Sequence, residues 1–232
     1  MTASALAAAA ALMVATLPAR AADSCLADAV SITRSDCLPE PIAQLDRDVD
    51  QALERALSRM NAAGRAALKA DHALYEQIRT AGLSATDFHL PVQMELRRDF
   101  LLAIREPRGR WLGDWANSTG SIHIARSPKG GFAVHASAAE PTLGHWRCEF
   151  DDSALLLDGR LTVGLASAAL DHGGPNEGWT LTLRLDGNVM NVTETAPAEG
   201  SARPPFCTGE GRLAGAYFAQ DHLRDAGPMV KR

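Results

Sequence analysis

The spacing of apolar residues changes once along the chain, at about residue 109. Before that point, apolar side chains recur every three or four positions, which is typical of helices with one buried face. The expected helices run over residues 40–60, 65–81 and 91–105. Asp46 and the other charged residues of the first helix are assigned to its solvent face. The sequence does not decide whether the first two helices are continuous through residues 61–64.

After residue 109, apolar and polar residues alternate in short segments separated by turn-forming residues, which predicts strands. Asp158-Gly159 is typical of a tight hairpin turn. No helical pattern interrupts the strands, so they should form an antiparallel meander that closes as an up-and-down β-barrel or packs as a sandwich, and closure would hide the edges. We expect an α+β protein. The expected strands cover 111–117, 122–124, 132–134, 145–150, 154–157, 161–165, 179–185, 189–193 and 212–218.

The first 17 residues are apolar and rich in alanine, and they are too few to span a bilayer comfortably. Ala19-Arg20-Ala21 matches the small-x-small pattern that precedes a signal-peptidase cleavage site. We therefore expect a signal peptide over residues 1–22, cleaved near Ala21 or Ala22, although no Lys or Arg precedes the apolar run. The alternative is a buried, alanine-rich helix. The expected divisions after it are a helical region (23–108), a barrel domain (109–220) and a flexible tail (221–232).

Four cysteines agree with export, because an even, small number in an exported chain indicates disulfides. Four cysteines allow three pairings. Proximity favours Cys25–Cys37, which leaves Cys148–Cys207 in the β-rich half. A metal site is the alternative, but no Cys-x-x-Cys spacing supports it. We expect a periplasmic or secreted protein with no membrane span after cleavage.

The formal net charge of −5 argues against a nucleic-acid partner, which requires a basic surface. It is compatible with a basic protein partner. The sequence does not indicate the oligomeric state.

The segment from Trp111 to Asn117 resembles the opening strand of lipocalin- and avidin-type barrels, which begins with Gly-x-Trp. The resemblance implies a calycin-like barrel in which Gly113 and Trp115 carry this motif and the tryptophan closes one barrel end. It also implies that an arginine of a late strand packs on the tryptophan, and Arg212 is the candidate.

The whole arrangement also resembles periplasmic lysozyme-inhibitor-like proteins, which are exported, cysteine-paired, and either helical or eight-stranded barrels. Barrel-type inhibitors carry Ser-Gly, two further residues and Tyr near the site that blocks lysozyme. This chain has Ala214-Gly215-Ala216-Tyr217, with alanine in place of serine and one residue instead of two between glycine and tyrosine. The resemblance implies a basic, lysozyme-like protein partner, with Gly215 and Tyr217 as candidate contact residues. His172, in a glycine-rich loop, is a further candidate.

Sequence motifs for catalysis are absent: the chain has no Gly-x-Ser-x-Gly, no His-Glu-x-x-His, no phosphate loop and no dinucleotide fingerprint. His123 and His135 are expected to be cross-strand neighbours on the outer face of a hairpin. Two histidines can hold a metal, but the sequence shows no third ligand, so a solvated pair is the favoured interpretation. We expect no catalytic residues, metal or cofactor.

These observations favour a non-enzymatic binding protein that uses the barrel-end loops 137–144, 166–178 and 195–206 against a protein partner. The alternative is a lipocalin-like carrier of a small apolar ligand. Large side chains from Phe132, Leu155 and Leu183 filling the interior would exclude the carrier. A cell-envelope hydrolase is the least favoured class, because its motifs are missing.

Overall fold

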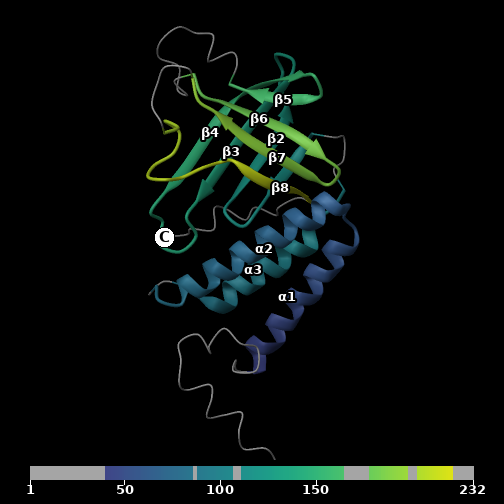
Figure 1. Cartoon of the computed structure of the whole chain (residues 1–232), viewed down its shortest axis with the longest axis vertical. Helices are drawn as coiled ribbons and strands as arrows, with labels where there is room; N and C mark the ends of the chain where they lie inside the picture. The colour runs from purple at the N-terminus through teal and green to yellow at the C-terminus, as the bar shows by residue number, and fades with distance from the viewer. Residues whose placement is uncertain (1–39, 86–87, 107–110, 165–177, 198–202, 222–232) are drawn as a thin grey trace, which may run out of the picture.

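The fold is a layer of three helices set against a closed β-barrel (Figure 1). The computed structural model describes residues 40–85, 88–106, 111–164, 178–197 and 203–221. The helices are α1 (Glu40–Ser58), α2 (Ala62–Gly82) and α3 (Leu90–Ala103). The strands are β1 (Gly113–Ala116), β2 (Gly120–Arg126), β3 (Phe132–Ala139), β4 (Arg147–Leu157), β5 (Arg160–Val163), β6 (Thr180–Asp186), β7 (Val189–Thr195) and β8 (Gly215–Gln220). The expected signal peptide, Cys25, Cys37 and the C-terminal tail lie outside the described residues.

The predicted architecture is confirmed. All eight strands pair antiparallel with their sequence neighbours, and β1 closes the barrel against β8 through the pairing of Trp115 with Ala219. Three helices precede the barrel, as the change of period indicated. None of the helices in the described part of the chain is long and apolar enough to cross a membrane.

The first two helices are separate, which settles the question that the sequence left open. The side chain of Asn61 caps α2 by accepting a hydrogen bond from the N–H of Gly64 at 2.7 Å. The turn between β6 and β7 lies directly against this cap. A Cβ on Gly187, whose φ is +61°, would lie 2.3 Å from the Asn61 amide nitrogen, so both the backbone and the close approach require glycine here.

Most strand ends differ from the prediction by a few residues, and two differences change the topology or the start of a strand. β4 is one continuous strand, although the polar run Asp151–Ser153 suggested a break; these residues keep their pairing with β3, and the exposed Asp151 side chain lies on the outer face. β8 begins at Gly215 rather than residue 212. The Glu194 carboxylate accepts hydrogen bonds from the N–H groups of Leu213 and Ala214, so this segment is held by a side chain rather than by a strand.

Apolar side chains fill the barrel interior. Phe132 and Leu183 are 8% and 0% exposed, as expected for a packed barrel, whereas Leu155 lies on the outside at 49% exposed. Further buried members of this core are Trp115, Ile122, Ile124, Val134, Phe150, Leu161, Val163, Leu181, Met190, Val192 and Tyr217.

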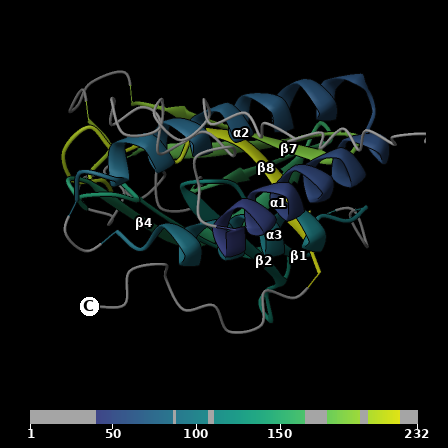
Figure 2. The same ribbon diagram turned by 90° about the horizontal axis from the view of Figure 1, so that it is seen from below.

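The helical layer covers the outer face of β7 and β8, as the view from the helical side shows (Figure 2). Val189 and Phe218 belong to the apolar cluster that the helices form, and Phe100 packs edge-on against Phe218 with ring centroids 6.2 Å apart. After α3 the chain runs along β8, where Ile104 pairs with Gln220. The helices and the barrel therefore share one continuous contact.

Candidate functional site: a disulfide-tied loop region

The Cys148–Cys207 disulfide joins β4 to the segment that precedes β8, as predicted. Its cysteines also form an isolated β-bridge. The backbone on either side is bonded as well, since Glu149 N–H donates to Phe206 O and Thr208 N–H donates to Arg147 O. Because the cysteines are 59 positions apart in the sequence, loop-closure entropy makes such a bridge worth about 4 kcal/mol. The segment is thus fixed to the barrel by covalent and hydrogen bonds.

Aromatic side chains pack beneath this segment. Phe206 lies edge-on to Phe150, with ring centroids 4.8 Å apart, and edge-on to Trp179 at 6.2 Å. Trp146 is half-buried against the same core. The segment therefore rests on a rigid apolar base.

The loop between β3 and β4, residues 140–146, is organised by one carboxylate. Glu140 accepts hydrogen bonds from the hydroxyl and the N–H of Thr142 and from the N–H of Leu143. Burial raises the pKa of Glu140, but these bonds, with a further one from the His145 N–H, outweigh it and lower the pKa to about 2. Because the carboxylate is ionised at any neutral pH, the loop keeps these bonds under ordinary conditions.

Leu143 stands at the exposed tip of this loop, with 60% of its surface accessible. It is followed by Gly144 at φ +66° and by the exposed His145. We call residues 140–149 and 203–211 the disulfide-tied surface. It combines an apolar tip with a hydrogen-bonded, cross-linked base.

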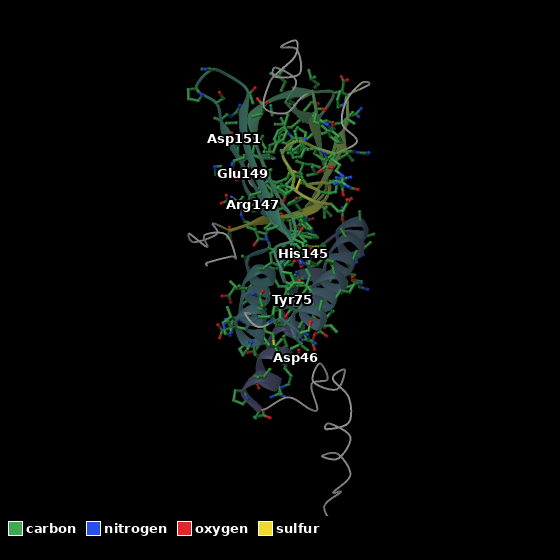
Figure 3. The ribbon with its side chains drawn as sticks, turned by 90° about the vertical axis from the view of Figure 1, so that its left-hand side faces the viewer. Asp46, Tyr75, His145, Arg147, Glu149 and Asp151 are labelled. Carbon is green, nitrogen blue, oxygen red and sulfur yellow. A yellow bond between two sulfur atoms is a disulfide. The ribbon has the colours of Figure 1, made fainter. Side chains whose placement is uncertain are left out.

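Charged side chains continue from this surface along β4. His145, Arg147, Glu149 and Asp151 follow one another up the edge of the barrel, above the helical layer that holds Tyr75 and Asp46 (Figure 3). Arg147 pairs with Glu149 at 2.8 Å, and Asp151 is 78% exposed. The outer edge of β4 therefore offers charge to a partner bound at the loop.

A second cluster of ionisable groups lies inside the helical layer. Arg79 of α2 pairs with Asp46 of α1 at 2.6 Å, and Arg97 of α3 pairs with Asp71 of α2 at 2.7 Å. The assignment of Asp46 to the solvent face was wrong, because this residue is 8% exposed. It stands three positions from the buried Ala43, on the same helix face.

The same cluster reaches the barrel. Ser118, in the turn after β1, donates its N–H to the Asp71 carboxylate at 2.8 Å, and its hydroxyl accepts from Arg97 at 3.0 Å. Burial, together with Arg97, lowers the pKa of His72 to about 4, and burial raises the pKa of Tyr75 to about 12. These groups hold α2 to its neighbours and the layer to the barrel, which is a structural role.

Gly113 and Trp115, two of the residues predicted to close one barrel end, lie on β1. Gly113 has a φ of +113° and Trp115 is 1% exposed; the indole N–H of Trp115 donates to Trp111 O at 3.0 Å. The expected packing of Arg212 on Trp115 stays a prediction. Arg212 is 43% exposed, its guanidinium lies 3.7 Å from Glu194, and it also donates to the Gly211 carbonyl.

The three residues predicted to contact a partner have different outcomes. Tyr217 is 1% exposed and donates its hydroxyl to Leu213 O at 2.9 Å, so it is a core residue and its assignment to a partner surface was wrong. Gly215 is exposed at the start of β8. His172 lies outside the described residues. His123 and His135 are paired across β2 and β3, as predicted.

The sequence analysis predicted the loop after β3 but missed the carboxylate that organises it and the apolar residue at its tip. A leucine in a polar inter-strand segment, three residues after Glu140, is the signal that would have identified it. In comparisons with known proteins, no protein-family model, curated protein or solved structure matches this chain.

Proposed function

We propose that the chain is an exported, non-enzymatic binding protein that recognises a protein partner in the cell envelope through the disulfide-tied surface. The observation that carries this proposal is the loop at residues 140–146, where Glu140 and the nearby disulfide hold Leu143 in a fixed, 60%-exposed position. A preorganised loop loses little entropy on binding. An apolar anchor ringed by polar groups is the usual centre of a protein interface.

Charge supports a basic partner, of which a lysozyme-like protein is the example we favour. Asp151 is 78% exposed beside the loop, and Glu149 is 56% exposed there but paired with Arg147, so Asp151 carries most of this support. Complementary charge mainly raises the rate of association and the specificity. The disulfide is compatible with export to the periplasm or the medium, where such bonds persist.

The packed interior argues against the alternative of a small-ligand carrier. Carriers need an enclosed apolar space, and here large side chains occupy the centre of the barrel. A surface hollow of about 390 Å³ is lined by the β4–β5 turn and by β6. A second, of about 330 Å³, is lined by the end of α1 and by the segment that follows α3. Neither is lined by the residues at the centre of the barrel.

The proposal is tested by binding of the oxidised full chain to a panel of basic lysozymes, with lytic activity measured in parallel. Leu143→Asp should weaken binding at least 10-fold, because it places a charge at the anchor. Glu140→Gln should weaken it less, by loosening the loop. Leu102→Asp is the matched control, since Leu102 is 46% exposed on α3.

A photo-crosslinker at position 143, compared with one at position 102, extends the test to other envelope partners. A partner of the proposed kind should form a crosslinked adduct at position 143. An excess of this chain without the crosslinker should abolish that adduct. Equal labelling from both positions, together with no lysozyme binding at micromolar concentration, would refute the proposal.

A further inference from the structure

Two histidines and two aspartates form a row across four neighbouring strands. The register pairs Asp114 of β1 with His123 of β2, His123 with His135 of β3, and His135 with Asp151 of β4. Their side chains lie on the outer face, because the neighbouring Ile122 and the other alternate residues of β2 and β3 are buried in the core. The two histidines therefore stand side by side in the middle, with one carboxylate on each flank.

Each histidine directs the same ring nitrogen toward its flanking carboxylate. His123 Nδ1 lies 2.6 Å from Asp114 Oδ1, and His135 Nδ1 lies 3.8 Å from Asp151 Oδ2. A neutral imidazole whose Nδ1–H donates to a carboxylate carries its lone pair on Nε2. Nε2 is thus the free ligand atom of His123. At 3.8 Å the Asp151 carboxylate is too far from His135 Nδ1 for a hydrogen bond, so it fixes no tautomer there and the ring of His135 can present Nε2 as well.

When a histidine binds a metal through one ring nitrogen, the other ring N–H often donates a hydrogen bond to a carboxylate. This bond orients the ring and makes it a stronger ligand. Directly opposed residues on antiparallel strands have Cβ atoms about 4.5–5.5 Å apart. Two imidazoles at that spacing can meet on one ion at metal–nitrogen distances of about 2.0–2.1 Å. The neighbouring outward positions Ser121, Ala125, Ala133 and Ser137 carry small side chains, which leave room for such an ion above the sheet.

We propose that this row is a divalent transition-metal site, with His123 Nε2 and His135 Nε2 as ligands, Asp114 orienting His123, and Asp151 adding negative charge beside His135. Imidazole nitrogen favours Zn²⁺ and Cu²⁺ over Mg²⁺ or Ca²⁺. Among the residues that the structure describes, no three His, Cys, Asp or Glu side chains converge on one point. The site is therefore an open, two-nitrogen chelate whose other positions belong to water or to an external ligand. It does not depend on the proposed binding partner.

The test uses the untagged, oxidised full chain, with Zn²⁺ followed by calorimetry and Cu²⁺ by electron paramagnetic resonance. The expected result is one tight site whose Cu²⁺ spectrum shows hyperfine coupling to two nitrogens. His123→Ala and His135→Ala should each weaken binding at least 10-fold. Asp114→Asn should weaken binding about 10-fold. Losing the carboxylate that orients a metal-binding histidine costs about 10–100-fold in affinity, and the low end is expected here because the Asp114–His123 pair is partly exposed.

His145→Ala is the matched control, because His145 is exposed and belongs to the loop before β4 rather than to the row; its affinity should equal that of the unaltered chain. His123 and His135 are 57% and 46% exposed, so both variants should keep the circular dichroism spectrum, and Gln variants provide a second pair. Binding that survives in the double His123→Ala, His135→Ala variant, or a spectrum of one coupled nitrogen, would overturn the proposal.

Discussion

The helical layer and the barrel are stabilised by different interactions. α1 packs closely on α3, but α2 has few close contacts with either and is tied to them by the ion pairs Asp46–Arg79 and Asp71–Arg97. The barrel interior is apolar, and the Cys148–Cys207 bridge reinforces it. The layer should therefore respond to charge and pH, and the barrel to the redox potential. All four tryptophans belong to the barrel half, and the three helices of the described residues precede it. Tryptophan fluorescence therefore reports on the barrel, and the helical signal in far-ultraviolet circular dichroism reports mainly on the layer.

The largest expected effect is loss of the disulfide. Cys148→Ser with Cys207→Ser should lower the free energy of unfolding by about 4 kcal/mol, because the unfolded chain regains the freedom of a long loop. Urea unfolding followed by tryptophan fluorescence measures this change. A loss below about 1 kcal/mol would mean that the hydrogen bonds around the bridge suffice to hold the segment.

Breaking the buried pair at Arg97 should be next in size. Arg97→Met leaves the 7%-exposed Asp71 side chain without its cation, which should cost about 3 kcal/mol. The double variant Asp71→Asn, Arg97→Met should recover part of this loss, because asparagine still accepts the N–H of Ser118. Circular dichroism in urea gives both values. If the double variant is no more stable than Arg97→Met, the unpaired Asp71 carboxylate is not the cause of the lost stability.

The pH dependence of the layer follows from His72. Burial and Arg97 lower its pKa to about 4, below the ordinary value of 6.5, so the unfolded state binds more protons between these two pH values. Stability should therefore fall as the pH drops from 7 to 4.5, by about 1–2 kcal/mol after allowance for partial exposure. His72→Gln should remove this part of the pH dependence, whereas His145→Gln, at an exposed position, should not.

The smallest effect concerns the junction of the two regions. Asn61→Ala removes the cap of α2 and should cost about 1 kcal/mol in urea unfolding. Because Asn61 also lies against Gly187, both spectroscopic probes should report the same loss. A loss seen by circular dichroism alone would show that the helical layer unfolds independently of the barrel.

Local patterns predicted the elements because their causes are local. Hydrophobic spacing identified the three helices, alternation and turn residues identified the barrel, and the register of one hairpin placed His123 beside His135. Cysteine count and proximity in the sequence also led to the correct Cys148–Cys207 pairing.

The remaining features depend on contacts between residues far apart in the sequence. Asp46 was assigned to solvent because its cation, Arg79, comes from another helix. Tyr217 was assigned to a partner surface, although its position in β8 directs it into the core. In each case the decisive partner is set by the tertiary arrangement.

The short length of β5 gives the disulfide a further consequence. β5 pairs only with the last residues of β4, from Ala154 to Leu157, so the beginning of β4 lacks this neighbour. Phe206 and Thr208 occupy that edge instead, through backbone hydrogen bonds on either side of the Cys207 bridge. An uncovered edge is a template for strands of other molecules. Reduction would thus expose this chain to aggregation by edge-to-edge association, a hazard separate from the stability it loses.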